Sequence, residues 1–141
     1  MRRRYVSFIL DQGRYCIAVE DVLQILRHEN LRDVPRAPSF VEGVINLRGD
    51  VVPVVNLRER FGLGKAAELR KPRIIVAQAR GRLYGLAVDE VREVVEIDDA
   101  AVREDGAGAV GAGSAFVRGM AERGGELYMI VDLAGLLGAP G

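Results

Sequence analysis

The sequence predicts a mostly β fold made of two copies of one five-stranded unit, each curled into a small closed barrel and ended by a short helix. Two observations predict it: the chain repeats itself, and its apolar runs are short, rich in β-branched residues and separated by glycine-bearing turns. Of the 141 residues, 49% are hydrophobic, which suits a globular core and excludes a disordered chain.

The repeat consists of two matched blocks in the same order. "YCIAVEDVLQIL" (15–26) matches "YGLAVDEVREVV" (84–95) at a distance of 69 residues, and "FVEGVINLRGDVVPVVNLRERFGLG" (40–64) matches 116–140 at a distance of 76. The second copy is longer in its middle, where "EDGAGAVGAGSA" (104–115) is rich in glycine and alanine and predicts a mobile loop. Chance is a poor explanation for two such blocks.

The domain organisation follows from this repeat. We expect one domain over residues 5–138, divided into approximate subdomains 5–70 and 71–138. The copies join near "GKAAELRKP" (64–72), where Pro72 interrupts regular structure.

Each copy opens with a predicted hairpin. "YVSFIL" and "RYCIAV" flank the turn-like "DQG", and "RIIVAQA" and "RLYGLAV" flank "RGR". A tight turn at "EDV" or "DEV" follows, and "LQILRHENLRDV" and "REVVEI" continue as strands.

The second block of each copy predicts a loop, a hairpin and a helix. "SFVEGV", after Pro35 and Pro38, is expected to be a loop or a short helical turn, and residues 44–57 form a hairpin closed at Gly49. "GELYMIVDL" closes the second unit in the same way. Pro53 within a strand predicts an edge strand or a bulge, because proline cannot donate a ladder hydrogen bond. Short helices are expected over Leu57–Phe61 and Leu133–Leu137, since Gly62 and Gly138 follow them.

Charge and cysteine content exclude several classes of protein. Lys+Arg and Asp+Glu are 20 each, and this zero balance argues against nucleic-acid binding. The longest apolar runs are strand-sized, so no membrane insertion is expected. The start "MRRRYVSFIL" resembles a signal peptide, but Asp11 ends the apolar run and no cleavage site follows. With Cys16 as the single cysteine, a reducing compartment fits, and we expect a cytoplasmic protein.

Catalytic and cofactor motifs are weak. His28 is the single histidine and is interpreted as a surface or satisfied polar residue, and Cys16 as a small core residue without a titratable partner. No Cys/His cluster has metal-ligand spacing. "GAGAVG" (106–111) fits the dinucleotide-binding pattern, but no strand precedes it and no helix opens at it, so a loop is expected. We predict no enzyme activity and no cofactor.

Arg48, in "VINLRGDVVPVVNL" (44–57), is the candidate functional residue of the hairpin. Its counterpart in the second copy is Gly124, although Gly49 matches Gly125 and Asp50 matches Glu126. The turn itself therefore does not demand arginine. Arg48 is either a solvated turn residue with a local salt bridge, or a guanidinium presented at a seam for a partner's carboxylate or carbonyl.

The run "FVEGVINLRGDVVPVVNLRERFGL", with "YCIAVEDVLQIL", "VPRAPSFVEGVINLRG" and "YGLAVDEVREVV", resembles the CheW-like adaptor family of bacterial chemotaxis. The likeness runs from about Tyr5 to Leu137. It implies two five-stranded SH3-like barrel subdomains and a scaffold that joins the cytoplasmic tip of a methyl-accepting receptor to a CheA-type histidine kinase, whose regulatory domain has the same fold.

The resemblance also implies partner-binding residues. They are Gly43, Asn46 and Arg48 in the N-L-R-G motif, Val22 and Gln24 before the third strand, and Val91 and Val94 in the second copy. Gln24 departs from the glutamate frequent in the family, so an ion pair there is in question. Val91 and Val94 match positions that line a receptor groove between subdomains, and ordinary core packing is the alternative.

We therefore expect a standalone adaptor that acts by binding alone, with a receptor helix in a groove between subdomains and several modest contacts acting by avidity. A similar scaffold in a pathway for pili or development is the alternative within the family. A small-ligand-binding β-barrel would need a deep pocket with converging polar groups, and a nucleic-acid-binding barrel would need a basic face with exposed aromatic side chains.

Overall fold

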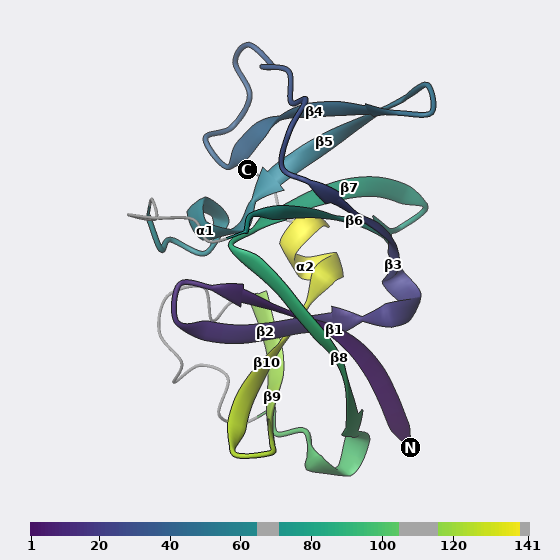
Figure 1. Ribbon diagram of the computed structural model, residues 1–141, viewed down its shortest axis with the longest axis vertical. Coiled ribbons are helices and arrows are strands. Elements are labelled where there is room, and N and C mark those ends of the chain that lie inside the picture. Colours follow the sequence, from purple (N-terminus) through teal and green to yellow (C-terminus); the bar gives the residue numbers. More distant parts are fainter. Residues whose placement is uncertain (65–70, 105–115, 139–141) are drawn as a thin grey trace.

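A computed structural model describes residues 1–64, 71–104 and 116–138 and shows two five-stranded sheets with short helices (Figure 1). The strands are β1 (Arg2–Leu10), β2 (Gly13–Ala18), β3 (Val22–Arg27), β4 (Val41–Leu47), β5 (Asp50–Asn56), β6 (Arg73–Ala79), β7 (Arg82–Val88), β8 (Glu90–Asp98), β9 (Val117–Arg123) and β10 (Glu126–Val131). The helices are η1 (Val19–Asp21), α1 (Leu57–Arg60), η2 (Asp99–Ala101) and α2 (Leu133–Gly138). Sheet A has the strand order β8-β1-β2-β10-β9, and sheet B has the order β3-β6-β7-β5-β4.

The two sheets repeat each other strand by strand, as the sequence predicts. Tyr5 pairs with Ala18 in sheet A, and Ile74, 69 residues after Tyr5, pairs with Ala87 in sheet B. The parallel pairings also repeat: Val54 pairs with Gly85 between β5 and β7, and their repeat counterparts, Ile130 and Cys16, pair between β10 and β2. A register shift also recurs at the start of β4 and of β9. The sequence repeat is thus a structural repeat at single-residue register.

The predicted boundary between subdomains is wrong. Sheet A combines β1 and β2 from the start of the chain with β8, β9 and β10 from its end, whereas sheet B holds β3 to β7. The two copies therefore exchange strands after their first hairpin, and neither 5–70 nor 71–138 corresponds to one sheet. Figure 1 shows the β3–β7 strands gathered in the upper half and the others in the lower half.

Three local expectations also differ from the structure. The segment "SFVEGV" is not a loop throughout, because β4 begins at Val41. The third strand ends at Arg27, and the chain then approaches β4 again, where Arg32 and Val44 exchange backbone hydrogen bonds of 2.9 and 2.8 Å. Pro53 lies in an inner strand without a bulge, but the pairing of β5 with β7 begins one residue later, at Val54, so no ladder bond to β7 is lost there.

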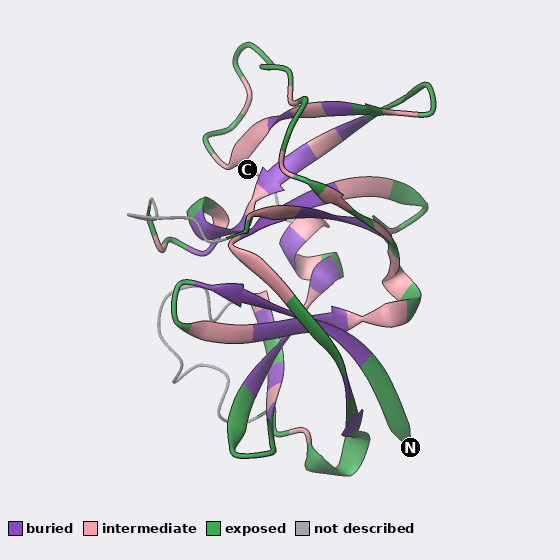
Figure 2. Cartoon of the chain, viewed as in Figure 1, coloured by how far each residue is buried: buried purple, intermediate pink, exposed green. Residues whose placement is uncertain are grey.

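Three buried clusters form the core, and the largest lies between the sheets. It takes side chains from both sheets and from both α helices, including Phe8, Ile75, Leu57, Phe61 and Leu136. Two smaller clusters fill sheet A and sheet B separately. The buried colour in Figure 2 accordingly marks much of the inner strands, whereas β3 has no buried residue, the middle of β8 is exposed, and hairpin tips are exposed.

The helices α1 and α2 begin with equivalent side-chain caps. Both helices contribute residues to the core cluster between the sheets. Asn56 accepts a hydrogen bond from the Glu59 amide (3.1 Å) at α1, and Asp132 accepts one from the Gly135 amide (3.1 Å) at α2. The predicted helices over 57–61 and 133–137 are confirmed within a residue. The segments 104–115 and 106–111, expected to be loops, lie almost wholly outside the described residues.

Candidate partner-binding surfaces

Arg48 occupies the tip of the β4–β5 hairpin. Leu47 pairs with Asp50, so Arg48 and Gly49 form a two-residue turn, and their φ angles of 54° and 90° fit a type I′ turn. The side chain is exposed, and the structure gives its guanidinium no hydrogen bond or ion pair within the described residues. The hairpin tip lies at the outer side of sheet B, away from sheet A, so the expected position at the seam is wrong (Figure 1). Arg48 thus places an exposed cation, unpaired within the described residues, on a projecting turn.

Asn46 and Gly43 serve the hairpin itself. The side-chain oxygen of Asn46 accepts a hydrogen bond from the Gly49 amide at 3.0 Å and so stabilises the turn. Gly43 is buried, and a Cβ built on it would lie 2.6 Å from the carbonyl oxygen of Arg32. Only glycine permits this approach of the 28–40 segment to β4. Both residues therefore support the fold of the hairpin directly.

The predicted residues of the third strands lie on the edge strands β3 and β8. Val22 and Val91 are half-buried and pack against the core cluster between the sheets. Gln24 is half-buried as well, and among the described residues its side chain has no recorded polar partner. Val94 is 46% exposed. Val94 is thus the most exposed of these residues, whereas Val22 and Val91 pack in part against the core cluster between the sheets.

Sequence reasoning missed the outward side chains beside them. Leu23 and Ile25 are exposed large apolar residues on β3, and Ile25 is the repeat counterpart of Val94. Val51 and Leu127, another counterpart pair, are also exposed, at the starts of β5 and β10. Alternation along "VLQILR" could have indicated Leu23 and Ile25, because one set of side chains in that strand must face away from the core.

The described residues do not assemble a catalytic or metal centre. No group of three or more potential metal-ligating side chains exists in the described ranges. Cys16 is fully buried, and burial raises the pKa of its thiol to about 12, so the reactive thiolate is absent near neutrality. His28 contacts the Glu42 carboxylate at 2.7 Å, which agrees with its interpretation as a satisfied polar residue.

Two open hollows lie on the surface of the described part of the chain. A hollow of about 530 Å³ lies between the end of β3 and β4, and one of about 420 Å³ lies where β5 and β7 diverge before Val54. Exposed residues such as Arg27, Glu29 and Arg82 contribute to their walls. These hollows lack the enclosure and converging polar groups that a small-ligand barrel needs.

Arg58, a residue that sequence reasoning did not single out, joins the two sheets. Its buried guanidinium contacts the Asp89 carboxylate at 2.6 Å and the Asp11 carboxylate at 3.3 Å, and its Nε donates to the Gly64 carbonyl at 3.0 Å. The Asp11 amide donates to the same Asp89 oxygen at 2.8 Å. Arg58 comes from α1 beside sheet B, Asp11 from the β1–β2 turn of sheet A, and Asp89 from the crossing between the sheets.

Comparison with known proteins gives consistent matches. The family model described as the CheW-like domain matches residues 4–140. A protein named chemotaxis protein CheW from Rhizobium meliloti (strain 1021) is 31% identical over 131 residues, which cover 93% of this chain and 84% of that protein. Chemotaxis protein CheW from Treponema pallidum (strain Nichols) is 25% identical over 132 residues, covering 91% and 78% of the two chains.

A solved structure shares the whole fold. The crystal structure of scaffolding protein TtCheW from Thermoanaerobacter tengcongensis has a TM-score of 0.89 and 34% sequence identity, and the match covers 100% of this chain and 96% of that one. Within the described ranges, no helix is long and apolar enough to cross a membrane.

Proposed function

The chain belongs to the CheW-like domain family, and on that premise we propose that it is a non-enzymatic cytoplasmic adaptor of bacterial chemotaxis. It couples the cytoplasmic tip of a methyl-accepting receptor to the regulatory domain of a CheA-type histidine kinase by protein–protein binding. The name scaffolding protein, carried by the structural neighbour, supports an adaptor rather than an enzyme.

The observation that carries the proposal is a duplicated apolar edge. Ile25 on β3 and Val94 on β8 are counterparts in the repeat, and they are 42% and 46% exposed. Each lies on the outermost strand of its sheet, where backbone groups on one side have no neighbouring strand in the sheet order. One chain thus presents two related docking edges, as a bridge between two proteins requires.

Arg48 would add a charged contact to a partner at a place away from both apolar edges. Its guanidinium projects from a rigid two-residue turn, and its counterpart position is glycine. The repeat therefore makes the apolar edges alike but gives sheet B a cation that sheet A lacks. This asymmetry lets the two ends of one adaptor discriminate between two partners.

The experiment is a pair of binding titrations, one with the kinase regulatory domain and one with a receptor cytoplasmic fragment. Ile25→Gln and Val94→Gln should each weaken binding of at least one partner by about 5- to 100-fold, as truncation of an apolar interface anchor does. Val34→Gln is the matched control, because Val34 is 39% exposed but lies in the segment between β3 and β4 and has no place on either edge. Unchanged affinity of both edge variants for both partners would overturn the proposal.

A further inference from the structure

Phe40 and Phe116 are repeat counterparts that contact the same arginine. Phe40 precedes β4 of sheet B, Phe116 precedes β9 of sheet A, and both are half-buried against the core cluster between the sheets. The guanidinium carbon of Arg60 lies 4.3 Å from the centroid of the Phe40 ring and 4.7 Å from that of the Phe116 ring. Both distances fit a cation–π contact, which extends to about 6 Å. Arg60 therefore contacts one of two equivalent rings beside each sheet.

The backbone holds these two rings in equivalent places. The Asn56 amide donates to the Phe40 carbonyl at 2.7 Å. The Asp132 amide donates to the Phe116 carbonyl at the same distance, 2.7 Å. Within the described residues, Phe40 and Phe116 have no recorded ring contact with each other. The guanidinium of Arg60 thus separates two rings that are fixed independently of it.

Arg60 also contacts the helix of the other sheet. Its Nη2 donates to the carbonyl of Leu136 at 3.3 Å, and Leu136 is the repeat counterpart of Arg60, 76 residues later. Arg60 comes from α1, which follows β5 of sheet B, whereas Leu136 comes from α2, which follows β10 of sheet A. One side chain therefore links a ring beside sheet B to a ring and a helix beside sheet A.

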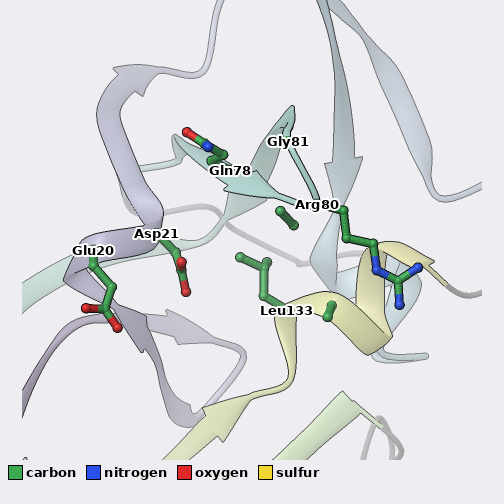
Figure 3. A pocket seen from close by; sticks show the side chains of 8 residues that line it. Glu20, Asp21, Gln78, Arg80, Gly81 and Leu133 are labelled. Carbon is green, nitrogen blue, oxygen red and sulfur yellow. The ribbon is translucent and has the colours of Figure 1, made fainter.

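The two helices differ in what they place between the sheets. α1 supplies Arg58 and Arg60, whereas α2 has Ala134 and Leu136 at the counterpart positions. Leu136 is buried in the core cluster. Ala134 lines a further open hollow, which Figure 3 shows beside Leu133 at the start of α2. α2 therefore offers no cation to the contact between the sheets, and α1 offers two.

We propose that Arg60 is a positioning residue that fixes the orientation of sheet A relative to sheet B, and with it the placement of the two apolar edges. A guanidinium is flat and stacks on aromatic faces, so it forms a spacer of constant thickness between two rings. Ile25 and Val94 lie on different sheets, so their relative placement depends on the contact between the sheets. The inference rests on the proposed function, because it concerns how the two docking edges are arranged.

Removal of the spacer should let the rings meet. Aromatic pairs favour centroid separations of about 4.5–7 Å, so Phe40 and Phe116 should approach each other in Arg60→Ala. This approach should turn sheet A against sheet B, because the contacts of Arg58 still hold the sheets at another point. Arg60→Lys keeps a cation between the rings and should hold them apart.

The first measurement is NMR of the full chain without partners. In the parent, the rings of Phe40 and Phe116 should give no cross-peaks with each other, and residual dipolar couplings from both sheets should fit one alignment tensor. Arg60→Ala should give these ring cross-peaks and change the orientation between the sheets, while the couplings still fit within each sheet. Arg123→Ala is the matched control, because Arg123 is exposed at the end of β9 within sheet A, and it should leave the orientation unchanged.

The second measurement is binding of the kinase regulatory domain, with and without a saturating receptor fragment. The loss of two cation–π contacts in Arg60→Ala should weaken binding about 5- to 30-fold when the receptor fragment is present. Without the receptor fragment, the affinity should stay within about twofold of the parent, as for sites that do not contact each other. Arg60→Lys should recover most of the loss.

The results that overturn the proposal are specific. They are unchanged rings and sheet orientation in Arg60→Ala, a loss of affinity that is equal with and without the receptor fragment, or no loss at all. Arg60→Leu, which installs the residue of the counterpart position, replaces Arg60→Ala if that variant does not fold, and the same changes are expected. If the parent chain binds neither partner, the proposed function fails, while NMR of the chain alone still decides whether Arg60 separates the rings and orients the sheets.

Discussion

Arg48 and Gly124 occupy the same position of two equivalent hairpin turns, with φ angles of 54° and 60°. A left-handed backbone is unfavourable for a side chain with a Cβ, and glycine adopts it without that cost. The second copy uses the favourable residue, whereas the first keeps an arginine that contacts nothing recorded in the described part of the chain. This contrast is the strongest structural reason to assign Arg48 to a partner.

The turn geometry predicts how Arg48 variants fold. Arg48→Gly should leave the free energy of unfolding unchanged or raise it by up to about 1 kcal/mol, because relief of the left-handed strain is partly offset by the entropy of glycine in the unfolded chain. Arg48→Ala should stay within about 0.5 kcal/mol, as at ordinary surface sites. Urea unfolding of the variants measures both. A loss above about 2 kcal/mol for either variant would show that the guanidinium supports the fold.

Gly43 should be required for folding more strongly than its counterpart. Gly43→Ala would bring a Cβ to 2.6 Å from a backbone oxygen of Arg32, and we expect a loss of about 1–3 kcal/mol. Gly119→Ala meets the Val102 side chain at 2.8 Å and the Arg103 oxygen at 3.2 Å, so a rotamer change relieves part of the contact and the loss should be smaller. Thermal unfolding of the two variants compares them, and the reverse order would contradict this account of Gly43.

The Arg58 network should stabilise the contact between the sheets. Arg58→Met leaves the mostly buried Asp89 carboxylate without its cation, and we expect a loss of about 2–4 kcal/mol. Asp89→Asn in addition should recover part of that loss, because the unpaired charge is removed. A double-mutant cycle by urea unfolding measures the coupling. Additive effects of the two substitutions would mean that the 2.6 Å contact contributes no coupling energy.

Asp21 should make stability depend on pH. Burial raises the pKa of Asp21 above its ordinary value of 3.8, so the folded state binds the proton more tightly than the unfolded state does. The ionised carboxylate therefore lowers stability at neutral pH, and this penalty disappears as the pH falls below 3.8. Asp21→Asn should be more stable than the parent at pH 7 and lose that advantage below pH 3.8 in unfolding measured across pH. An advantage that is equal at both pH values would contradict the assignment to ionisation.

The sequence predicted the hairpins, because each depends on local turn chemistry and strand alternation. The hairpin turn at Gly49 and the short helix that precedes Gly62 were predicted for that reason. The sequence did not predict that β3 joins the sheet of the second copy and β8 that of the first. A repeat specifies how strands within one hairpin pair, but not which sheet the next strand joins. The repeat therefore predicted the paired strands correctly, but the division at residue 70 does not separate the two sheets.

The candidate site was predicted in part. The N-L-R-G motif located Arg48, but the close approach of Arg32 to Gly43 and the pairing of Arg58 with Asp89 depend on contacts between segments far apart in the chain. Val94 was predicted as a groove residue through the family resemblance, whereas its repeat counterpart Ile25, which is 42% exposed, was not singled out. The alternation along β3 carried the signal for Ile25, but that β3 and β8 are the outermost strands of their sheets follows only from the strand order.

The most direct test of the adaptor function is receptor-dependent phosphorylation of a CheA-type kinase, measured with the receptor and kinase of the same cell. Adding this chain should raise the phosphorylation rate, and Arg48→Ala should raise, by about 5- to 150-fold, the concentration of the chain that gives half of the maximal increase, if the guanidinium makes a desolvated contact. Arg48→Lys should recover only part, because an ammonium lacks the planar fork. A rate that is the same with and without the chain would contradict the account.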